Sequence, residues 1–359
     1  MTMSVHEQEQ VVTASTAVVA SPSKLHVNQS CLEVLRYLKE CGLLEYCNDE
    51  TSIDHDDRLV ASWCSSSSNG SDNKVKFDED GFVSSLDLGG KRLYRGFPIP
   101  GKTAPTATGN KTRMVLPPFD KFQRLKTLNL AGTDLPLNDT MKVLEMIQST
   151  IEVLFLGGNG LGVAGGKAIA SWLSGLAGGG GGRSHLAKLD LRYNDLGDEG
   201  MTSLCCDGLM KMTGTGTEAL GDCCNVRHLY VEGNDIGDSG VDALARLLNH
   251  QGNVSKETAG SESYGIREVY LGANKIRHVG AQSLASTLHT NKMISKIYLE
   301  GNQIGLQGAN AFSEVLEQLN GNTSLQQLFV DNNNIGKEGS KRLAQALNSG
   351  TSIGDMIDT

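Results

Sequence analysis

The chain has 359 residues, a formal net charge of −9, 43 glycines and only 18 aromatic residues (2 Trp, 8 Tyr and 8 Phe). The excess of acid disfavours binding to nucleic-acid phosphates, and no apolar run has bilayer length, so we expect neither a nucleic-acid nor a membrane partner. Its 8 cysteines form no C-x-x-C pair and its N-terminus has no basic and apolar leader, so we expect reduced thiols, no metal site and a cytoplasmic location.

The first part of the chain divides into a tail and a cap. Residues 1–25 are small and polar without periodicity, and we expect them to be disordered. We assign residues 26–82 to a helical N-terminal cap region. Its helix is predicted to begin at the capping box Ser30-x-x-Glu33 and to end near Gly42.

The next segment, residues 83–124, is interpreted as an atypical first repeat followed by a loop. Apolar residues at Val83, Leu86 and Leu88 have the spacing of the later copies. Lys91 stands where most of those copies have asparagine. A stretch that contains proline and glycine follows and is typical of a loop.

Residues 125–359 contain regular copies of one repeat, in which L-x-x-L-x-L-x-x-N precedes an I-G-x-x-G turn. The copies begin at Leu125, Ile151, Leu186, Val226, Ile266, Ile294 and Leu325. The alternating apolar residues predict a short strand, and the glycine-containing segment predicts a helix start. The asparagines are predicted to form a buried ladder that satisfies backbone groups at the turn: Asn159, Asn194, Asn234, Asn274, Asn302 and Asn333.

One copy imitates a dinucleotide-binding turn. Gly160-x-Gly162-x-x-Gly165 follows a strand-like run, and Asp190 lies further along the chain. A cofactor fingerprint occurs once in a domain, whereas this turn recurs after the same apolar frame in the other copies. We therefore expect no bound cofactor.

The frame LxxLxLxxNxIGxxGxxxLxxxL resembles the leucine-rich repeats of the ribonuclease-inhibitor type, found also in the Ran GTPase-activating protein and NOD-like receptors. Trp63-Cys64 and the sequence DEDGFVSSLDLGGKRLYRG resemble the N-terminal cap and first repeat of plant-type leucine-rich-repeat proteins, although the usual cysteine pair is absent. The resemblance implies an α/β fold, a right-handed horseshoe-shaped solenoid with a parallel concave sheet and convex helices. It implies no chemistry by itself.

The central outward position of each predicted strand forms a candidate binding stripe. In chain order this position holds Asn129, Phe155, Asp190, Tyr230, Tyr270, Tyr298 and Phe329. Aromatic side chains beside charged ones are enriched in protein interfaces. The alternative is that the rings only stabilise the sheet through cross-strand contacts, and the two interpretations are compatible.

Charged residues flank the stripe on both sides. Two positions later the column includes Arg192, Glu232, Glu300 and Asp331. The positions before the stripe include Lys188, Arg227, His228, Arg267 and Lys296, which predicts a basic edge opposite an acidic one. Such a face favours a partner of complementary polarity.

The sequence therefore predicts a non-enzymatic scaffold whose concave face binds another protein. We expect no catalytic residue, because the histidines lack metal-ligand spacing and no G-x-S-x-G element occurs. An alternative is activation of a small Ras-like or Ran-like GTPase. A third interpretation is a sensor fragment similar to the repeats of a NOD-like receptor.

Overall fold

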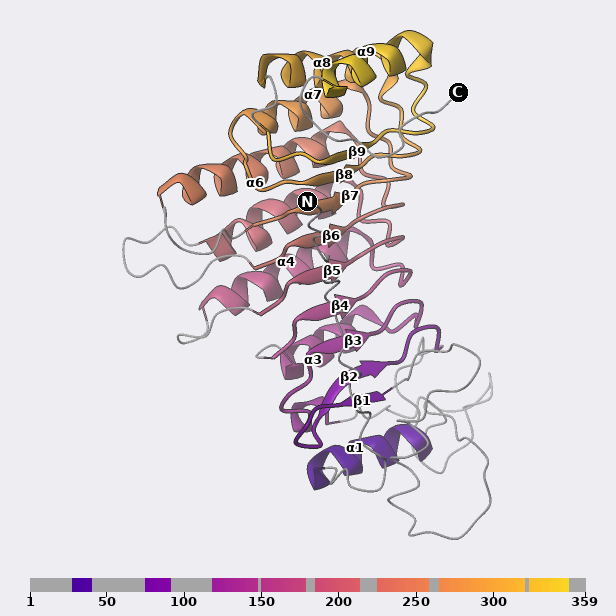
Figure 1. Cartoon of the computed structure of the whole chain (residues 1–359). Coiled ribbons are helices and arrows are strands. Elements are labelled where there is room, and N and C mark those ends of the chain that lie inside the picture. The colour runs from indigo at the N-terminus through magenta and orange to yellow at the C-terminus, as the bar shows by residue number, and fades with distance from the viewer. Residues whose placement is uncertain are drawn as a thin grey trace, which may run out of the picture.

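The computed structural model describes residues 28–40, 75–91, 118–147, 150–178, 185–213, 225–257, 265–319 and 323–348. Within these ranges one nine-stranded sheet runs in chain order from β1 to β9 (Figure 1). Its strands are β1 (Val75–Phe77), β2 (Val83–Asp87), β3 (Thr127–Asn129), β4 (Val153–Phe155), β5 (Lys188–Asp190), β6 (His228–Tyr230), β7 (Glu268–Tyr270), β8 (Lys296–Tyr298) and β9 (Gln327–Phe329). All neighbouring pairs from β2 to β9 are parallel.

The helices of the repeats stack along one side of this sheet (Figure 1). They are α3 (Leu137–Ile147), α4 (Gly162–Gly178), α5 (Gly197–Ser203), α6 (Asp238–Glu257), α7 (His278–Ser286), α8 (Gly305–Leu319) and α9 (Gly336–Asn348). A π-helical turn, Leu204–Leu209, continues α5. The predicted α/β leucine-rich-repeat solenoid is confirmed. No helix in the described ranges combines the length and hydropathy that a bilayer crossing requires.

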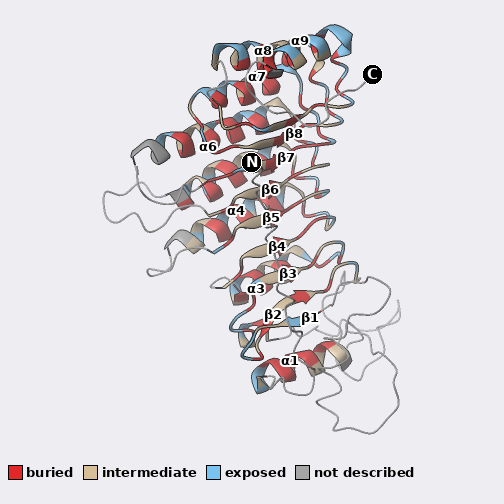
Figure 2. Cartoon of the chain, in the orientation of Figure 1, coloured by how far each residue is buried: buried red, intermediate tan, exposed pale blue. Residues whose placement is uncertain are grey.

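The apolar residues of the frame form one continuous core between sheet and helices (Figure 2). The middle residue of each strand points inward, so Leu189, Leu229 and Val269 are fully buried. From the helices, Leu244, Leu284 and Leu288 close the core from the other side. The period of two along each strand leaves the flanking strand residues on the opposite face, which we call the sheet face.

The predicted asparagine ladder is present and crosses from repeat to repeat. Asn234 Oδ1 accepts hydrogen bonds from the backbone N–H groups of Asn194 and Leu196, at 3.0 and 3.3 Å. Asn234 Nδ2 donates to Leu191 O at 2.9 Å. Asn274 repeats the arrangement one copy later, toward Asn234 N and Val231 O. Each amide thus satisfies turn groups of the preceding copy and fixes the stacking of neighbouring repeats.

Helix starts on the convex side are joined by a second contact between repeats. Asp198 Oδ1 accepts from Gly237 N and Gly240 N at 2.7 and 2.9 Å, so an aspartate of one copy caps the helix of the next. A Cβ at Gly240 would lie only 2.8 Å from Asp198 Oδ1, which explains why this position has no side chain. Asp238 makes the same pair of contacts with the following copy.

At the N-terminal end, helix α1 (Gln29–Glu40) lies below the antiparallel hairpin of β1 and β2 (Figure 1). Strand β1 pairs antiparallel with β2, and the turn between them is held by Asp78 Oδ1, which accepts from Phe82 N at 2.9 Å. Strand β1 was not predicted, because three residues are too few to show a period. Strand β2 pairs in parallel with β3, so residues 83–87 extend the parallel sheet toward the N-terminus. The tail 1–25 and the Trp63-Cys64 pair lie outside the described residues.

Candidate protein-binding surface

The sheet face contains a stack of four aromatic rings on neighbouring strands. Strand register places Tyr230, Tyr270, Tyr298 and Phe329 directly opposite one another on β6 to β9. The centroids of successive rings are 4.1, 4.1 and 4.5 Å apart, and their planes are within 10° of parallel. We call these four residues the aromatic ladder. The predicted stripe is therefore continuous over the last four strands.

Stacking determines which parts of the aromatic rings are covered and which are accessible. The inner rings are covered on both faces by their neighbours, so these faces stabilise the sheet and are closed to a ligand. All four residues are nevertheless only half-buried, so part of each side chain remains exposed to solvent. The two interpretations of the stripe thus apply to different parts of the same side chains.

The stripe changes character at β5, where Asp190 replaces an aromatic residue. Asp190 is buried, and both its carboxylate oxygens accept hydrogen bonds from the Arg192 guanidinium, at 3.0 Å from Nε to Oδ1 and 2.7 Å from Nη2 to Oδ2. Lys188 Nζ lies 5.1 Å from the ring centroid of Phe155 and 4.5 Å from that of Tyr230. A cation therefore fills the gap between Phe155 and the ladder and contacts a ring on each side.

One edge of the ladder is a closed polar network centred on Glu268. Glu268 Oε2 accepts from the Tyr270 hydroxyl at 2.9 Å and lies 3.2 Å from His228 Nδ1. Its Oε1 is 3.0 Å from Lys296 Nζ. Burial alone would raise the pKa of Glu268, but the hydrogen bonds from Lys296, Tyr270 and His228 outweigh burial and lower the pKa. Burial, the Tyr230 hydroxyl and the bond to Glu268 raise the pKa of Tyr270, so its phenol remains a donor.

The other edge is acidic, and its charges are not neutralised in the same way. We call Glu232, Glu300 and Asp331 the acidic edge; they follow β6, β8 and β9 at equivalent positions. Arg192 Nε lies 3.5 Å from Glu232 Oε2, yet this oxygen is shielded from solvent and accepts no hydrogen bond. Within the described ranges Glu300 and Asp331 have no ion-pair partner. Burial raises the pKa of Glu232 and of Glu300, and carboxylates nearby raise both further.

The candidate site residues thus fall into two groups. The structure brings together the ladder and the acidic edge on β6 to β9, with Arg192 at their border. Phe155 lies outside the stack, beyond Lys188. The predicted basic edge is interrupted by Glu268, a residue that the sequence analysis did not include. The signal was available, because Glu268 occupies the same strand position as Lys188, His228 and Lys296.

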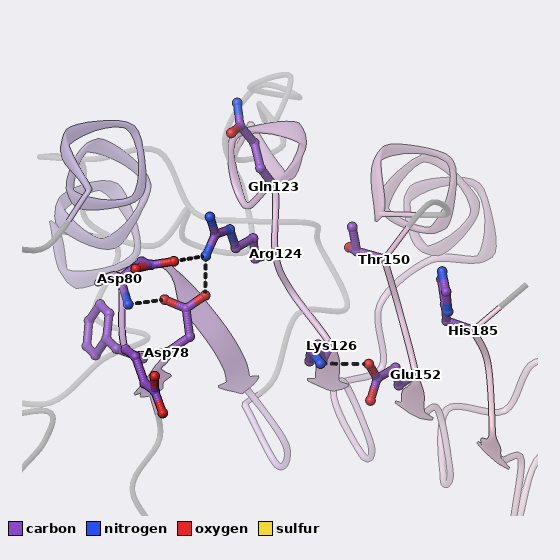
Figure 3. A pocket seen from close by; sticks show the side chains of 10 residues that line it. Asp78, Asp80, Gln123, Arg124, Lys126, Thr150, Glu152 and His185 are labelled. Atoms are coloured by element: carbon purple, nitrogen blue, oxygen red, sulfur yellow. Dashed lines mark hydrogen bonds and ion pairs between the residues drawn. The ribbon is translucent and has the colours of Figure 1, made fainter. Parts of the chain in front are cut away.

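A separate hollow of about 700 Å³ lies at the N-terminal ends of the first strands (Figure 3). Several of the charged side chains that line it form ion pairs with one another. Arg124 Nη1 is 2.5 Å from Asp80 Oδ2 and 3.3 Å from Asp78 Oδ2. Lys126 Nζ is 2.9 Å from Glu152 Oε1. These charges satisfy one another, so the hollow is a weaker candidate than the sheet face.

Nothing in the described ranges groups three or more His, Cys, Asp or Glu side chains in a way that could hold a metal ion. Cys205, in the π-helical turn, is fully buried, and burial raises the pKa of its thiol. A thiol of raised pKa is a poor nucleophile and a poor metal ligand. Cys205 is therefore a small apolar core residue.

Comparison with known proteins supports the repeat assignment. A family model described as Leucine Rich repeat matches residues 184–205 and 222–245. Protein CARMIL from Dictyostelium discoideum is 32% identical over 117 residues, which cover 30% of this chain and 10% of that protein. The chain thus matches about a tenth of that relative's length.

Two solved structures are also similar. The first, titled Leiomodin-1 Actin-Binding Site 2, has a TM-score of 0.26 at 18% identity over 33% of this chain and 63% of its own. The second, a TLR13–ssRNA13 complex, has a TM-score of 0.36 at 16% identity over 70% of this chain and 31% of its own. Likenesses this weak identify no partner or activity for this chain.

Proposed function

We propose that this chain is a non-enzymatic scaffold that binds another protein on its sheet face, through the aromatic ladder and the residues beside it. The observation that supports the proposal is the ladder itself, four half-buried rings stacked with nearly parallel planes across four neighbouring parallel strands. Rigid aromatic side chains contribute large contact areas at a low cost in conformational entropy, which is why interface hot spots are enriched in them.

The surroundings of the ladder suit a protein partner better than a small molecule. The face is a broad surface, and the hollow of about 700 Å³ lies at the other end of the sheet, beside β1 to β5. Strand pairing and the asparagine ladder hold the four rings in place, so little order has to be gained on binding. The charges of Arg192, Glu232, Glu300 and Asp331 at the border would supply orientation.

The test is capture of partners from a lysate of the source cell with three forms of the protein. The first is wild type and the second is the triple variant Tyr230→Ala, Tyr270→Ala, Tyr298→Ala. The third is a matched control, Arg246→Ala, Gln282→Ala, Gln318→Ala, whose positions are exposed on α6, α7 and α8. Circular dichroism and urea unfolding must first show that all three forms are folded.

We expect at least one protein that wild type and the helix-side control retain and the ladder variant loses. Equal capture by all three forms would contradict the proposal and leave the ladder with a structural role alone. Activation of a small GTPase, a cytoplasmic location and the absence of enzymatic activity stay predictions. A GTPase captured through the ladder would justify an assay of GTP hydrolysis.

A further inference from the structure

We propose that the partner segment bound on β6 to β9 is an extended, basic stretch of protein, with arginine or lysine at alternate positions along the acidic edge. This inference rests on the proposed function and goes one step further, because it specifies the chemistry of the partner. It follows from the distribution of charge on the sheet face, from a gap at one strand and from the spacing of the strands.

The two edges of the ladder differ in their unused binding capacity. On the Glu268 edge, each carboxylate oxygen already has partners within the chain, Tyr270 and His228 on one oxygen and Lys296 on the other. On the acidic edge, Glu300 and Asp331 have no cation within the described ranges, and Glu232 Oε2 accepts no hydrogen bond. A cationic side chain from a partner would supply the missing donor at Glu232 Oε2 and a counter-charge for Glu300. The overall charge of −9 favours the same kind of partner.

A gap in the acidic edge marks where such a side chain would lie. Gly272 follows β7 and has no side chain between Glu232 and Glu300. A Cβ placed there would lie 3.7 Å from Glu232 Cγ and 3.7 Å from Glu300 Oε2, so both acidic side chains border the space above this glycine. A guanidinium above Gly272 would be within reach of both carboxylates and could form charge-assisted hydrogen bonds with them.

The spacing of the strands determines how far apart the positively charged side chains of the partner segment should be. Neighbouring strands are about 4.8 Å apart, so the gap over β7 and the midpoint between the Glu300 and Asp331 strands are about 7 Å apart. In an extended chain, side chains at i and i+2 lie on one side and are about 6.6 Å apart. Two cations at alternate positions would therefore fit both places when the segment runs across the strands. The exposed ring edges of the ladder lie beside this path and would contact the aliphatic parts of the segment.

The probes are two fluorescein-labelled peptides of equal composition, each with about four arginines among about eight serines, which is more than long enough to cross the four strands. One peptide has arginine at every second position and the other at every third, where successive arginines of an extended chain point to opposite sides. Anisotropy titrations use wild type, Glu232→Gln/Glu300→Gln, and the control Glu145→Gln/Glu338→Gln. The control removes the same charge from exposed positions on α3 and α9.

We expect the alternating peptide to bind wild type at least about fivefold more tightly than the other peptide, and to lose affinity as salt rises. The Glu232→Gln/Glu300→Gln variant should weaken its binding by about tenfold or more, and the control by less than about twofold. Equal affinity for the two peptides, or equal losses in the two variants, would mean general attraction to an acidic protein and would overturn the inference.

The same variants separate this inference from the proposed function. In the lysate capture, a partner lost by the ladder variant but fully retained by Glu232→Gln/Glu300→Gln would show binding on the sheet face without a basic segment. The inference would then fail while the proposed function stands. Equal capture by wild type and the ladder variant would remove the proposed function and the inference together.

Discussion

Strands β2 to β5 and strands β6 to β9 share one backbone plan but differ at the outward position of the stripe. In the first region this position holds Asp87, Asn129, Phe155 and Asp190. In the second it holds the aromatic ladder. The two sets of strands pair in the same parallel register, so the difference lies in the side chains alone.

The polar residues of the first region bind their own backbone. Asp87 Oδ1 accepts from Gly89 N at 2.8 Å, Asn129 Oδ1 from Ala131 N at 2.9 Å, and Asp190 Oδ1 from Arg192 N at 3.1 Å. Each is a local turn contact two residues along the chain. Aromatic side chains cannot form it, so in the second region they stack on each other and present their edges outward. One repeat frame can therefore carry, side by side, a surface whose polar groups bind their own backbone and a surface of stacked aromatic rings.

The largest expected effect concerns the border between the two regions. Arg192→Met would leave the carboxylate of Asp190, 2% exposed, without its cation, and we expect a loss of about 3 kcal/mol in the free energy of unfolding. Asp190→Asn should cost less, about 1.5 kcal/mol, because the Arg192 side chain is 41% exposed and can bind water instead. Urea unfolding followed by circular dichroism measures both.

The order of these two losses is the decisive result. An equal or larger loss for Asp190→Asn would mean that the buried, unpaired carboxylate of Asp190 is not the main penalty, and that the contacts of Arg192 with Tyr230 and Glu232 add little to stability. Arg246→Met on α6 is a matched control, because that arginine pairs with Asp242 on an exposed helix surface. It should change stability by about 0.5 kcal/mol or less.

The second prediction compares the two regions at one strand position. Tyr270→Ala removes two stacked contacts, at 4.1 Å on each side, and we expect a loss of about 2 kcal/mol in the free energy of unfolding. Asn129→Ala removes one local hydrogen bond at a half-buried position and should cost about 1 kcal/mol or less. The same unfolding experiment measures both variants.

A double-mutant cycle sharpens this comparison. Tyr230→Ala and Tyr270→Ala should be coupled by about 0.5–1.5 kcal/mol, because the rings are in direct contact. Asn129→Ala and Tyr270→Ala should be additive, since β3 and β7 are separated by three strands. Additivity of the two tyrosines would mean that their stacking contributes nothing to stability, and only the proposed binding role of the ladder would then remain.

Most of the fold could be predicted because its signals repeat. The apolar frame occurs at each strand, and the asparagines at its end predict both the turn and the ladder that Asn234 and Asn274 form. The register between neighbouring strands could also be predicted, because equivalent positions of parallel repeats must face one another. The outward residues of the ladder could be identified for the same reason. Strand β1 could not, since it belongs to no repeat and pairs antiparallel.

The electrostatics of the site could be predicted only in part. Charge signs along each column follow from the sequence, but pairing depends on side-chain conformations across strands. Glu268 thus forms an ion pair with Lys296 and contacts His228 Nδ1 on the edge that was predicted to be basic. Lys188 lies between two rings, and Glu232 remains partly unsatisfied, because of distances that no single repeat determines.

The smallest expected effect concerns the difference between the two edges of the ladder. Substitutions at Glu300 and at Glu268 should change the free energy of unfolding with opposite pH dependences. The pKa of Glu300 is raised in the folded chain, so its ionised form opposes folding, and Glu300→Gln should raise the free energy of unfolding by less than about 1 kcal/mol near pH 7. This gain should disappear as the pH falls below the usual glutamate pKa of about 4.3, where Glu300 is protonated in both states.

Glu268 should behave in the opposite way, because its pKa is lowered in the folded chain. Its ionised form contributes stability that is present above the usual glutamate pKa and is lost as the pH falls through its own depressed pKa. Glu268→Gln should therefore lower the free energy of unfolding near pH 7, and its difference from wild type should shrink on acidification. Urea unfolding at several pH values measures both variants. If the two variants differed from wild type in the same direction at every pH, the carboxylates of the two edges would be equally well compensated within the chain. The acidic edge would then have no unpaired charge to attract a cationic partner.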